Sequence, residues 1–386
     1  MSELERRTLW VRAGGRCTLC KAYLLEGALS AVEVPLGERA HIVGREDSAN
    51  SARGEHPMPV EDRDDIDNLM LACSLCHTEI DKKRVEGILD VDLLRDLKRK
   101  HETDIKTQTG LLRDSRTAIV RLAGTIRGDV MQLPRKAAAE AVIRCAGRFP
   151  FFVEAYDRQG VEIDLLQVDG EYPLEETYYR TATRRIDAAL ETRVMPGIAS
   201  GDIDHVSVFA IARLPLLIYL GWKLNDGIPA DIYQRHRSTD DWQWPDSTAA
   251  TDFTVTHDPD PSAGQNLDAG LYEDAVLITN LSGTTPVTDL PAELHDAARW
   301  TISPDTGPAE DVFAGAEVLA RFVAALRGFF TDLETTHKHI KRLHVLGALP
   351  LAGAIELGRS LKSDALRPTL VTYDRTQQGY TVALEV

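Results

Sequence analysis

The chain has 386 residues, and 60 acidic against 44 basic residues give it a formal net charge of −16 at pH 7. At about 100–200 residues per domain, this length predicts two or three domains. The composition, 43% hydrophobic and 27% charged, excludes a collagenous, low-complexity or wholly disordered chain. No apolar run reaches the ~18 residues of a membrane span, and the charged N-terminus lacks an apolar signal core, so we expect a cytoplasmic protein with no membrane partner.

The charge is unevenly spread. Residues 1–110 hold 17 Lys and Arg against 21 Asp and Glu, a net of −4, and the rest of the chain carries −12. This acidic balance excludes a protein that coats nucleic acid without specificity. Contact with DNA phosphates should therefore be local, and the basic clusters Lys82-Lys83-Arg84 and Lys98-Arg99-Lys100 are the candidates.

Three helices and one short strand are predicted in the first 110 residues. The helices are Leu4–Ala13, a segment from Cys73 to Arg84, and a segment capped by Asp90 that runs to about Lys106; the strand is Asn68–Ala72. Residues 44–66 are polar, with Gly and Pro, and predict a loop. We place a domain boundary at Gln108-Thr-Gly110.

Four of the five cysteines form two CxxC pairs, Cys17-x2-Cys20 and Cys73-x2-Cys76. In a reducing compartment this pattern indicates zinc rather than disulfides. Four thiolates satisfy the tetrahedral shell that Zn²⁺ prefers, and such a closed shell is structural. The metal would tie the two pairs together and contribute on the order of 10 kcal/mol or more to folding.

The second cysteine pair lies inside a longer pattern. It runs Ala40-His41-Ile42-Val43, then Asp67-Asn68-Leu-Met-Leu-Ala-Cys-Ser-Leu-Cys-His77. A histidine on a strand can act as general base for a water, and an amide and an imidazole nearby can hold a divalent cation on a phosphate. The pattern resembles the HNH endonuclease family in its zinc-bound ββα-metal form, over about residues 1–105.

The resemblance implies a role for each matching residue. His41 would be the general base, and Asn68 and His77 would hold a catalytic Mg²⁺ or other divalent cation, or orient the site. Many HNH enzymes have an acidic metal ligand just before the first histidine, and here that position is Ala40. Asp67 could contribute instead, although it also suits a loop cap. The substrate implied is double-stranded DNA.

After about residue 115 strands alternate with helices, which favours α/β architecture. The predicted elements are a strand over Thr117–Val130, an Ala-rich helix over Pro134–Arg144, a hairpin of Phe151–Tyr156 and Val161–Leu166 turning at residues 157–160, a long helix over Leu174–Val194, and a polar connector over residues 245–270.

An internal repeat crosses this connector. Each copy predicts a strand, a Leu-Pro turn, a helix with a glycine near its end, and a strand that ends at a tyrosine. The landmarks are Pro215, Gly221 and Tyr233 in the first copy and Pro350, Gly358 and Tyr373 in the second, at offsets of 135, 137 and 140 residues. Three landmarks in the same order at nearly constant offset indicate a duplication.

The repeat resembles the SAVED domain, a fusion of two CARF-like, Rossmann-type units that bind cyclic oligonucleotide messengers. The strand and small-residue loop over Leu277–Pro286 support it, and no P-loop, GxGxxG or nucleophile elbow is present. HNH and SAVED together resemble the DNA-degrading effector of CBASS antiphage defence. The expected fold is an α+β zinc-bound ββα-metal (HNH) domain over 1–110, then an α/β SAVED domain over 115–386 with CARF-like halves at about 115–245 and 270–386.

The same resemblance implies a cyclic di- or trinucleotide activator and a homo-oligomer, a dimer that forms tetramers or more on activation. Open α/β sheets bind ligands at the carboxyl ends of their strands, where helix N-termini offer amides to phosphates and aromatic rings can stack on bases. The ligand-binding residues predicted there are Arg213, Tyr233, Arg235, Trp242, Ser282, Gly283, Thr284, Tyr373 and Arg375, with Trp244 as a further stacking candidate.

Two other functions fit the same residues. One is a zinc-ribbon DNA-binding regulator with a small-molecule sensor, in which the histidines are structural. The other is a restriction nuclease that acts on modified DNA without any cyclic nucleotide.

Overall fold

The computed structural model describes residues 3–26, 32–110, 116–152, 161–245, 250–258, 273–361 and 367–386. The chain divides into two compact units, Met1–Leu111 and Leu112–Val386, each with its own hydrophobic core. None of the helices in these described ranges is long and apolar enough to cross a membrane.

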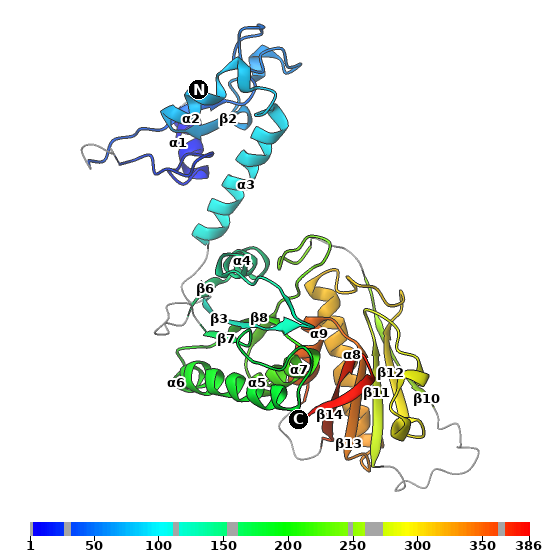
Figure 1. Cartoon of the computed structure of the whole chain (residues 1–386). Coiled ribbons are helices and arrows are strands. Elements are labelled where there is room, and N and C mark those ends of the chain that lie inside the picture. Colours follow the sequence, from blue (N-terminus) through cyan, green and yellow to red (C-terminus); the bar gives the residue numbers. More distant parts are fainter. Residues whose placement is uncertain are drawn as a thin grey trace. The chain divides into compact units, whose positions relative to one another are not determined.

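The N-terminal unit is built on a two-stranded antiparallel sheet in which His41 lies opposite Leu69. Its elements are α1 (Glu3–Arg12), β1 (Glu38–His41), β2 (Leu69–Ala72), α2 (Ser74–Ile80) and α3 (Val91–Gly110) (Figure 1). All four residues of β2 are buried, between α1 and the rest of a small core that includes Leu9, Ile42 and Leu94. The predicted cap of α3 is confirmed, because Asp90 Oδ1 accepts a hydrogen bond from Leu93 N at 2.8 Å. The helix predicted from Cys73 to Arg84 ends at Ile80.

The first half of the C-terminal unit has a parallel sheet of order β6-β3-β8-β9, with β7 also paired to β3. Its strands are β3 (Arg116–Ala123), β6 (Phe149–Phe151), β7 (Val161–Asp164), β8 (Val206–Ile211) and β9 (Ala230–Ile232). Its helices are α4 (Arg135–Ala141), α5 (Glu176–Ala189), α6 (Met195–Ser200) and α7 (Leu214–Leu224), and π-helical turns extend α4 and join α5 to α6.

Two predictions in this half are wrong. The strand predicted over Thr117–Val130 is broken, because Arg127 and Gly128 both take positive φ and fold β4 (Thr125–Ile126) back on β5 (Asp129–Val130). The predicted hairpin is two strands that pair in succession with the same edge of β3, both parallel to it. Alternating side chains are common to both arrangements, so the pattern could not distinguish them; the proposed turn at 157–160 lies outside the described residues.

The second half has a sheet of order β10-β12-β11-β13-β14-β15, parallel from β12 to β14 and antiparallel at both edges. Its elements are β10 (Phe253–Asp258), β11 (Asp274–Asn280), β12 (Ala298–Pro304), α8 (Ala316–Thr336), β13 (Arg342–Ala348), α9 (Leu351–Arg359), β14 (Thr369–Thr376) and β15 (Gly379–Glu385). The polar connector predicted over 245–270 thus contains an edge strand, whose Phe253 and Val255 pack on the core. Residues 246–249 and 259–270 of that connector lie outside the described ranges.

The repeat corresponds to β8-α7-β9 and β13-α9-β14, and its two helices pack directly on each other. A Cβ on Gly221 of α7 would lie 1.9 Å from Ile355 O, and a Cβ on Gly358 of α9 would lie 2.0 Å from Ile218 O. Gly358 is the repeat partner of Gly221, and Ile355 is the repeat partner of Ile218, both at an offset of 137 residues. A contact in which i touches j and j touches i is the signature of a two-fold axis, so the halves are related by pseudo-two-fold symmetry.

Replacing Gly221 with Ala should destabilise the C-terminal unit. The new methyl group would meet helix backbone, which cannot turn aside as a side chain can, so α7 and α9 must separate. We expect a loss of about 1–3 kcal/mol in the free energy of unfolding, measured by urea denaturation.

Gly328 provides the matched control. It lies inside α8, and a Cβ there would have no atom within 4 Å. Gly328→Ala should raise stability by about 0.5–1 kcal/mol through helix propensity alone. Equal stability of the two variants would contradict the close helix contact.

Candidate functional site

The four cysteines of the two CxxC pairs come together in the N-terminal unit. Their sulfur atoms all lie within 4.8 Å of one another, and Cys20 Sγ and Cys73 Sγ are 3.7 Å apart. Cys73 also caps α2, because its sulfur accepts from Cys76 N at 3.4 Å. A disulfide needs about 2.05 Å between sulfurs, whereas four separate thiols at this spacing suit the tetrahedral shell of Zn²⁺.

The four thiols of this cluster resist ionising together. Burial and the neighbouring thiols raise the pKa of Cys76, and burial raises that of Cys20. Burial also opposes ionisation of Cys17, but backbone N–H groups around its sulfur outweigh it and lower its pKa to about 7. Four thiolates at this spacing repel one another unless a metal compensates them, so the donor set fits zinc.

His41 ends β1 and is held by a carboxylate that the sequence analysis did not single out. Its Nε2 lies 2.9 Å from Asp64 Oδ1, and Arg45 Nε lies 3.6 Å from the other Asp64 oxygen. The hydrogen bond from His41 lowers the pKa of Asp64, so this carboxylate remains charged near neutrality. The pair fixes the imidazole ring and leaves Nδ1 without a hydrogen-bond partner in the described part of the chain.

Asn68 is buried and holds the backbone of the loop beside His41. Its Oδ1 accepts from Val43 N at 2.9 Å, and its Nδ2 donates to Val43 O at 3.0 Å and Arg63 O at 2.8 Å. Asn68 was predicted either to hold a metal or to orient the site, and these hydrogen bonds to the loop are of the kind that the orienting role requires. Its amide nitrogen donates two hydrogen bonds to the loop, and its oxygen accepts one.

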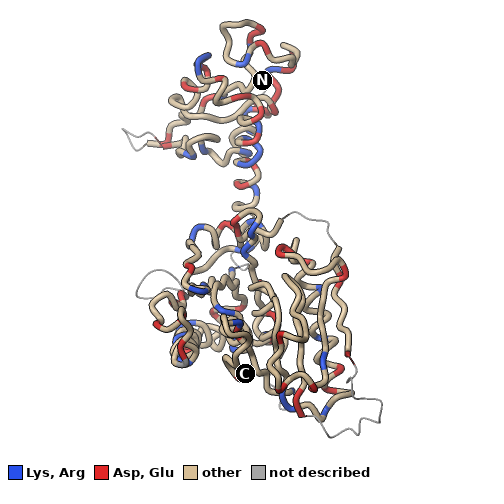
Figure 2. The backbone as a smooth tube through the Cα atoms, turned by 45° about the vertical axis from the view of Figure 1, so that its right-hand side comes forward, with Lys and Arg blue, Asp and Glu red and all other residues tan. Residues whose placement is uncertain are grey.

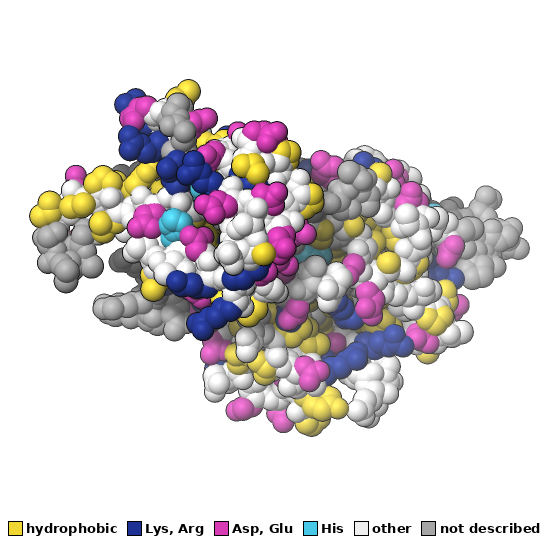
Figure 3. Space-filling model, turned by 90° about the horizontal axis from the view of Figure 1, so that it is seen from above, with side chains coloured by type: hydrophobic (Ala, Val, Ile, Leu, Met, Phe, Trp, Pro, Cys, Tyr) yellow, Lys and Arg dark blue, Asp and Glu magenta, His cyan; other side chains and the backbone are white. Residues whose placement is uncertain are grey.

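His77, on α2, has a carboxylate at each ring nitrogen. Nδ1 lies 2.7 Å from Glu38 Oε2, and Nε2 lies 3.3 Å from Asp81 Oδ2. Because the two carboxylates lie at opposite ring nitrogens, the three side chains do not converge on one point. Among the residues that the structure describes, the four cysteines alone form a group whose donor atoms could share a metal. Ala40, where many HNH enzymes have an acidic residue, is buried in the core, and the acidic partners of His77 are Glu38 and Asp81. Figure 3 shows a histidine open to the surface and bordered by acidic side chains.

Four of the nine predicted ligand residues line two cavities, which lie at the carboxyl ends of the two parallel sheets. A cavity of about 1010 Å³ is lined by Arg213 and Arg375, together with Arg127 and Tyr172. A smaller one of about 250 Å³ contains Arg235 and Ser282. The pseudo-two-fold axis relates them, because the larger lies at the N-terminus of α7 beside the end of β14, and the smaller lies at the N-terminus of α9 beyond the end of β9.

Arg213 is buried, and two carboxylates that the sequence analysis missed bind it. Its Nε donates to Glu171 Oε1 and its NH1 to Asp374 Oδ2, both at 2.6 Å. Burial opposes the charge of Glu171, but hydrogen bonds from the backbone N–H groups of Gly128 and Arg127, and Arg213 itself, lower its pKa overall. The predicted cation is therefore already neutralised within the fold, and it joins the two halves.

Arg375 is the most exposed of the predicted cations, with 55% of its side chain accessible and Asp289 Oδ2 3.0 Å from its NH2. Arg235 is mostly covered and pairs with Asp240. The Ser282-Gly283-Thr284 loop is hydrogen-bonded to the end of β13, since Ser282 N donates to Ala348 O at 3.0 Å.

The predicted aromatic residues are core residues. Tyr233 is buried and stacks on Phe209 with ring centroids 4.3 Å apart, and Trp242 packs edge-on against the same ring at 5.4 Å. Trp242 is thus not available to stack on a base, contrary to the prediction, because the apolar ring gains more from the interior than from the surface. Tyr373 hydrogen-bonds through its hydroxyl to His344 Nδ1 at 2.9 Å, and Trp244 is partly buried against the core.

Comparison with known proteins identifies the family of the C-terminal unit. The family model described as "SMODS-associated and fused to various effectors sensor domain", SAVED, matches residues 186–386, more than half of the chain. The chain belongs to the SAVED family. The predicted α/β SAVED domain with parallel sheets is thereby confirmed over these residues, and before it stands an α+β unit with a four-cysteine cluster.

Solved structures similar to the chain are SAVED/CARF-domain receptors named Cap4. The Acinetobacter baumannii receptor with the cyclic trinucleotide 3'3'3'-cAAA, and the same receptor with 2'3'3'-cAAA, each match at 12% identity and a TM-score of 0.46, over 80% of this chain and 66% of that one. The Moraxella osloensis receptor matches at 12% identity and a TM-score of 0.41, over 85% and 66%. The chain thus spans slightly less than two thirds of the length of these receptors. No curated protein sequence matches it.

Replacing Cys73 with Ser should release zinc from the N-terminal unit, because three thiolates no longer close the shell and the cap of α2 weakens. We expect zinc, counted per chain by elemental mass spectrometry, to fall from one to near zero and the unit to unfold. Cys145→Ser is the control, since this cysteine lies outside the cluster and should leave the zinc content unchanged. One tightly held zinc in the Cys73 variant would rule out the four-cysteine site.

Proposed function

We propose that the protein is a cyclic-oligonucleotide-activated, metal-dependent HNH endonuclease that degrades double-stranded DNA as an effector of CBASS antiphage defence. The observation that carries the proposal is the His41–Asp64 pair, together with a His77 flanked by carboxylates, in a unit that has a four-cysteine cluster and is joined to a SAVED sensor. The resemblance of residues 1–105 to HNH enzymes supports the same assignment.

The side chains divide the hydrolysis between them. His41 accepts the proton of the attacking water at Nδ1, while Asp64 holds the ring at Nε2 and stabilises the imidazolium that forms. Asn68 keeps the loop beside His41 in place through its three hydrogen bonds. His77 with one of its two carboxylates, Glu38 or Asp81, would hold the divalent cation, which would supply charge stabilisation at the leaving oxygen of the phosphodiester.

The activator would bind across the pseudo-two-fold axis at the carboxyl ends of the two sheets. The cavity of about 1010 Å³ lies at the upper end of the range for small-molecule sites and offers Arg127 and Arg375 to phosphates. The A. baumannii receptor was solved with cyclic trinucleotides, which supports a ligand of this class here. Because both halves line the cavity, a bound ring would tie them together.

Activation would proceed through assembly of a homo-oligomer, a dimer forming tetramers or more. The N-terminal residues 1–110 carry a net charge of −4, so a single unit attracts DNA poorly. Several units on one duplex gain about 10²–10⁴ in avidity through effective concentration.

Replacing His41 with Ala should abolish DNA cleavage while leaving zinc content and ligand binding intact. A positioned general base contributes about 10²–10⁴-fold, so plasmid nicking with Mg²⁺ and a panel of cyclic di- and trinucleotides should fall at least about 100-fold. Asp64→Asn should give a smaller loss with a shifted pH profile, because the ring keeps its base but loses its charged partner. Wild-type protein that binds DNA but never cuts it, under every ligand, would favour the zinc-ribbon regulator instead.

Replacing Arg375 with Gln should weaken binding of 3'3'3'-cAAA, measured by thermal shift. A charge-assisted hydrogen bond is worth about 1.5–3 kcal/mol, so the dissociation constant should rise by about 10–100-fold. Arg342→Gln is a matched control, because it also pairs with an aspartate but lies at the opposite, amino end of the same sheet. An equal effect of both substitutions would place the ligand elsewhere.

A further inference from the structure

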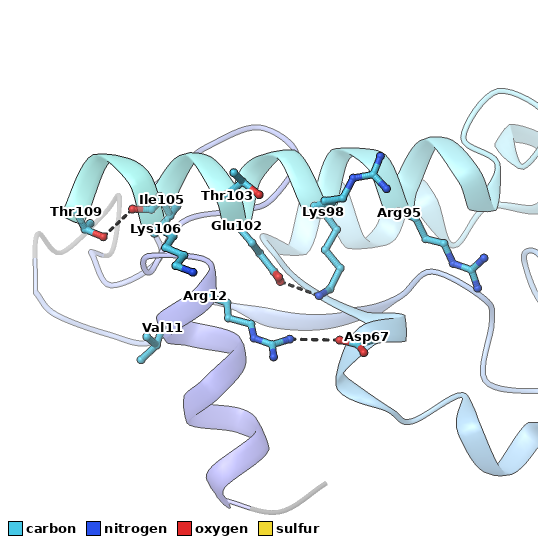
Figure 4. A pocket seen from close by; sticks show the side chains of 11 residues that line it. Val11, Arg12, Asp67, Arg95, Lys98, Glu102, Thr103, Ile105, Lys106 and Thr109 are labelled. Atoms are coloured by element: carbon cyan, nitrogen blue, oxygen red, sulfur yellow. Dashed lines mark hydrogen bonds and ion pairs between the residues drawn. The ribbon is translucent and has the colours of Figure 1, made fainter. Parts of the chain in front are cut away.

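A groove of about 660 Å³ lies between α1 and α3 of the N-terminal unit, apart from His41, Asp64, His77 and the four cysteines. Five basic side chains line it, Arg12 from α1 and Arg95, Lys98, Arg99 and Lys106 from α3 (Figure 4). Only two acidic residues, Asp67 and Glu102, do so. The groove therefore carries a net charge of about +3 within a unit whose total is −4.

The fold leaves part of this positive charge uncompensated. Lys98 Nζ pairs with Glu102 at 2.8 Å, and Arg12 NH1 pairs with Asp67 at 3.3 Å. Arg95 and Lys106 are exposed and have no acidic partner among the residues that the structure describes. Figure 4 shows their side chains on the side of α3 that faces α1, with the Lys98–Glu102 pair between them.

The spacing of the two unpaired cations fits a polyanion rather than a single anion. Arg95 and Lys106 stand three helical turns apart on one stripe of α3, about 16 Å along the axis. DNA advances about 3.4 Å per nucleotide along each strand, so this distance matches about five nucleotides. Val11 and Ile105 add apolar surface between the cations, which suits the sugars that alternate with phosphates.

The groove also leads toward the proposed catalytic residues. Asp67 borders it and directly precedes Asn68, whose side chain braces the loop beside His41. Leu69, the next residue, lies opposite His41 in the two-stranded sheet. We infer that the groove binds the sugar–phosphate backbone of double-stranded DNA and holds one strand in register with His41. This rests on the proposed nuclease function for its substrate.

The test measures binding of full-length protein to a short fluorescein-labelled duplex by anisotropy, without added Mg²⁺ to prevent cleavage, over a range of NaCl concentrations. Arg95→Gln with Lys106→Gln should weaken binding about tenfold at low salt and reduce the slope of log K against log[salt] by about 1.8, because two phosphates would no longer be neutralised by the protein. Arg6→Gln with Lys100→Gln is the control. It removes the same charge from the same unit, at one exposed position on α1 and one on α3 that both lie outside the groove, and should change neither quantity as much.

Each outcome decides the point. Equal binding by the two double variants, or no binding of the duplex by wild-type protein at low salt, would overturn the groove as a DNA site. Loss of self-association instead of DNA binding in the Arg95/Lys106 variant would show that an acidic segment of another copy occupies it. The proposed function is judged separately, because His41→Ala should bind the duplex normally and fail only to cut it. DNA binding through the groove without cleavage by wild-type protein would refute the nuclease and leave the groove standing.

Discussion

The contact between α7 and α9 determines how the sensor unit is built. Glycine on each helix lets the backbone of the other approach to a distance that no side chain would allow, and the contact is made twice, once on each side of the pseudo-two-fold axis. Because both helices begin at the carboxyl ends of their sheets, this packing brings those ends to one side of the molecule. Each strand end then reaches the opposite helix, Gln234 accepting from Ala352 N and Asp374 accepting from Arg213. Residues of both halves therefore line each of the two cavities at this edge.

The two sides of the axis differ in charge, and the difference matters for recognition. On one side a neutral amide meets the N-terminus of α9; on the other, Arg213 lies buried between Glu171 and Asp374. Buried charges are tolerated only when paired, and the Arg127-Gly128 turn helps by giving two N–H groups to Glu171. A phosphate that binds here meets an arginine already neutralised. The cations that attract it must therefore be Arg375 and Arg127 at the rim of the cavity, unless the phosphate displaces a carboxylate from Arg213. Figure 2 shows how acidic and basic residues intermingle along the chain.

Features that depend on residues close together in the sequence could be predicted, and features that depend on residues far apart in the sequence could not. The zinc cysteines, the Asp90 cap and the repeat landmarks depend on local spacing, which the chain itself records. Asp64, Glu171 and Asp374 act on partners 23 to 161 residues away, and one aspartate in an acidic run looks like any other. Trp242 was predicted to stack on a ligand but is buried, because the sequence alone does not show which aromatic rings pack in the core.

Charge links the two units in the proposed function. Two unpaired cations in one groove make about two phosphate contacts, far fewer than the 6–10 contacts that give a protein a steep salt dependence of DNA binding. An isolated copy of a chain with a net charge of −16 would therefore leave DNA largely untouched. Four such grooves held on one duplex would together reach about eight contacts, within that range. The weak single groove is then what makes cleavage depend on assembly, since a strongly basic nuclease unit would cut DNA before any messenger was bound.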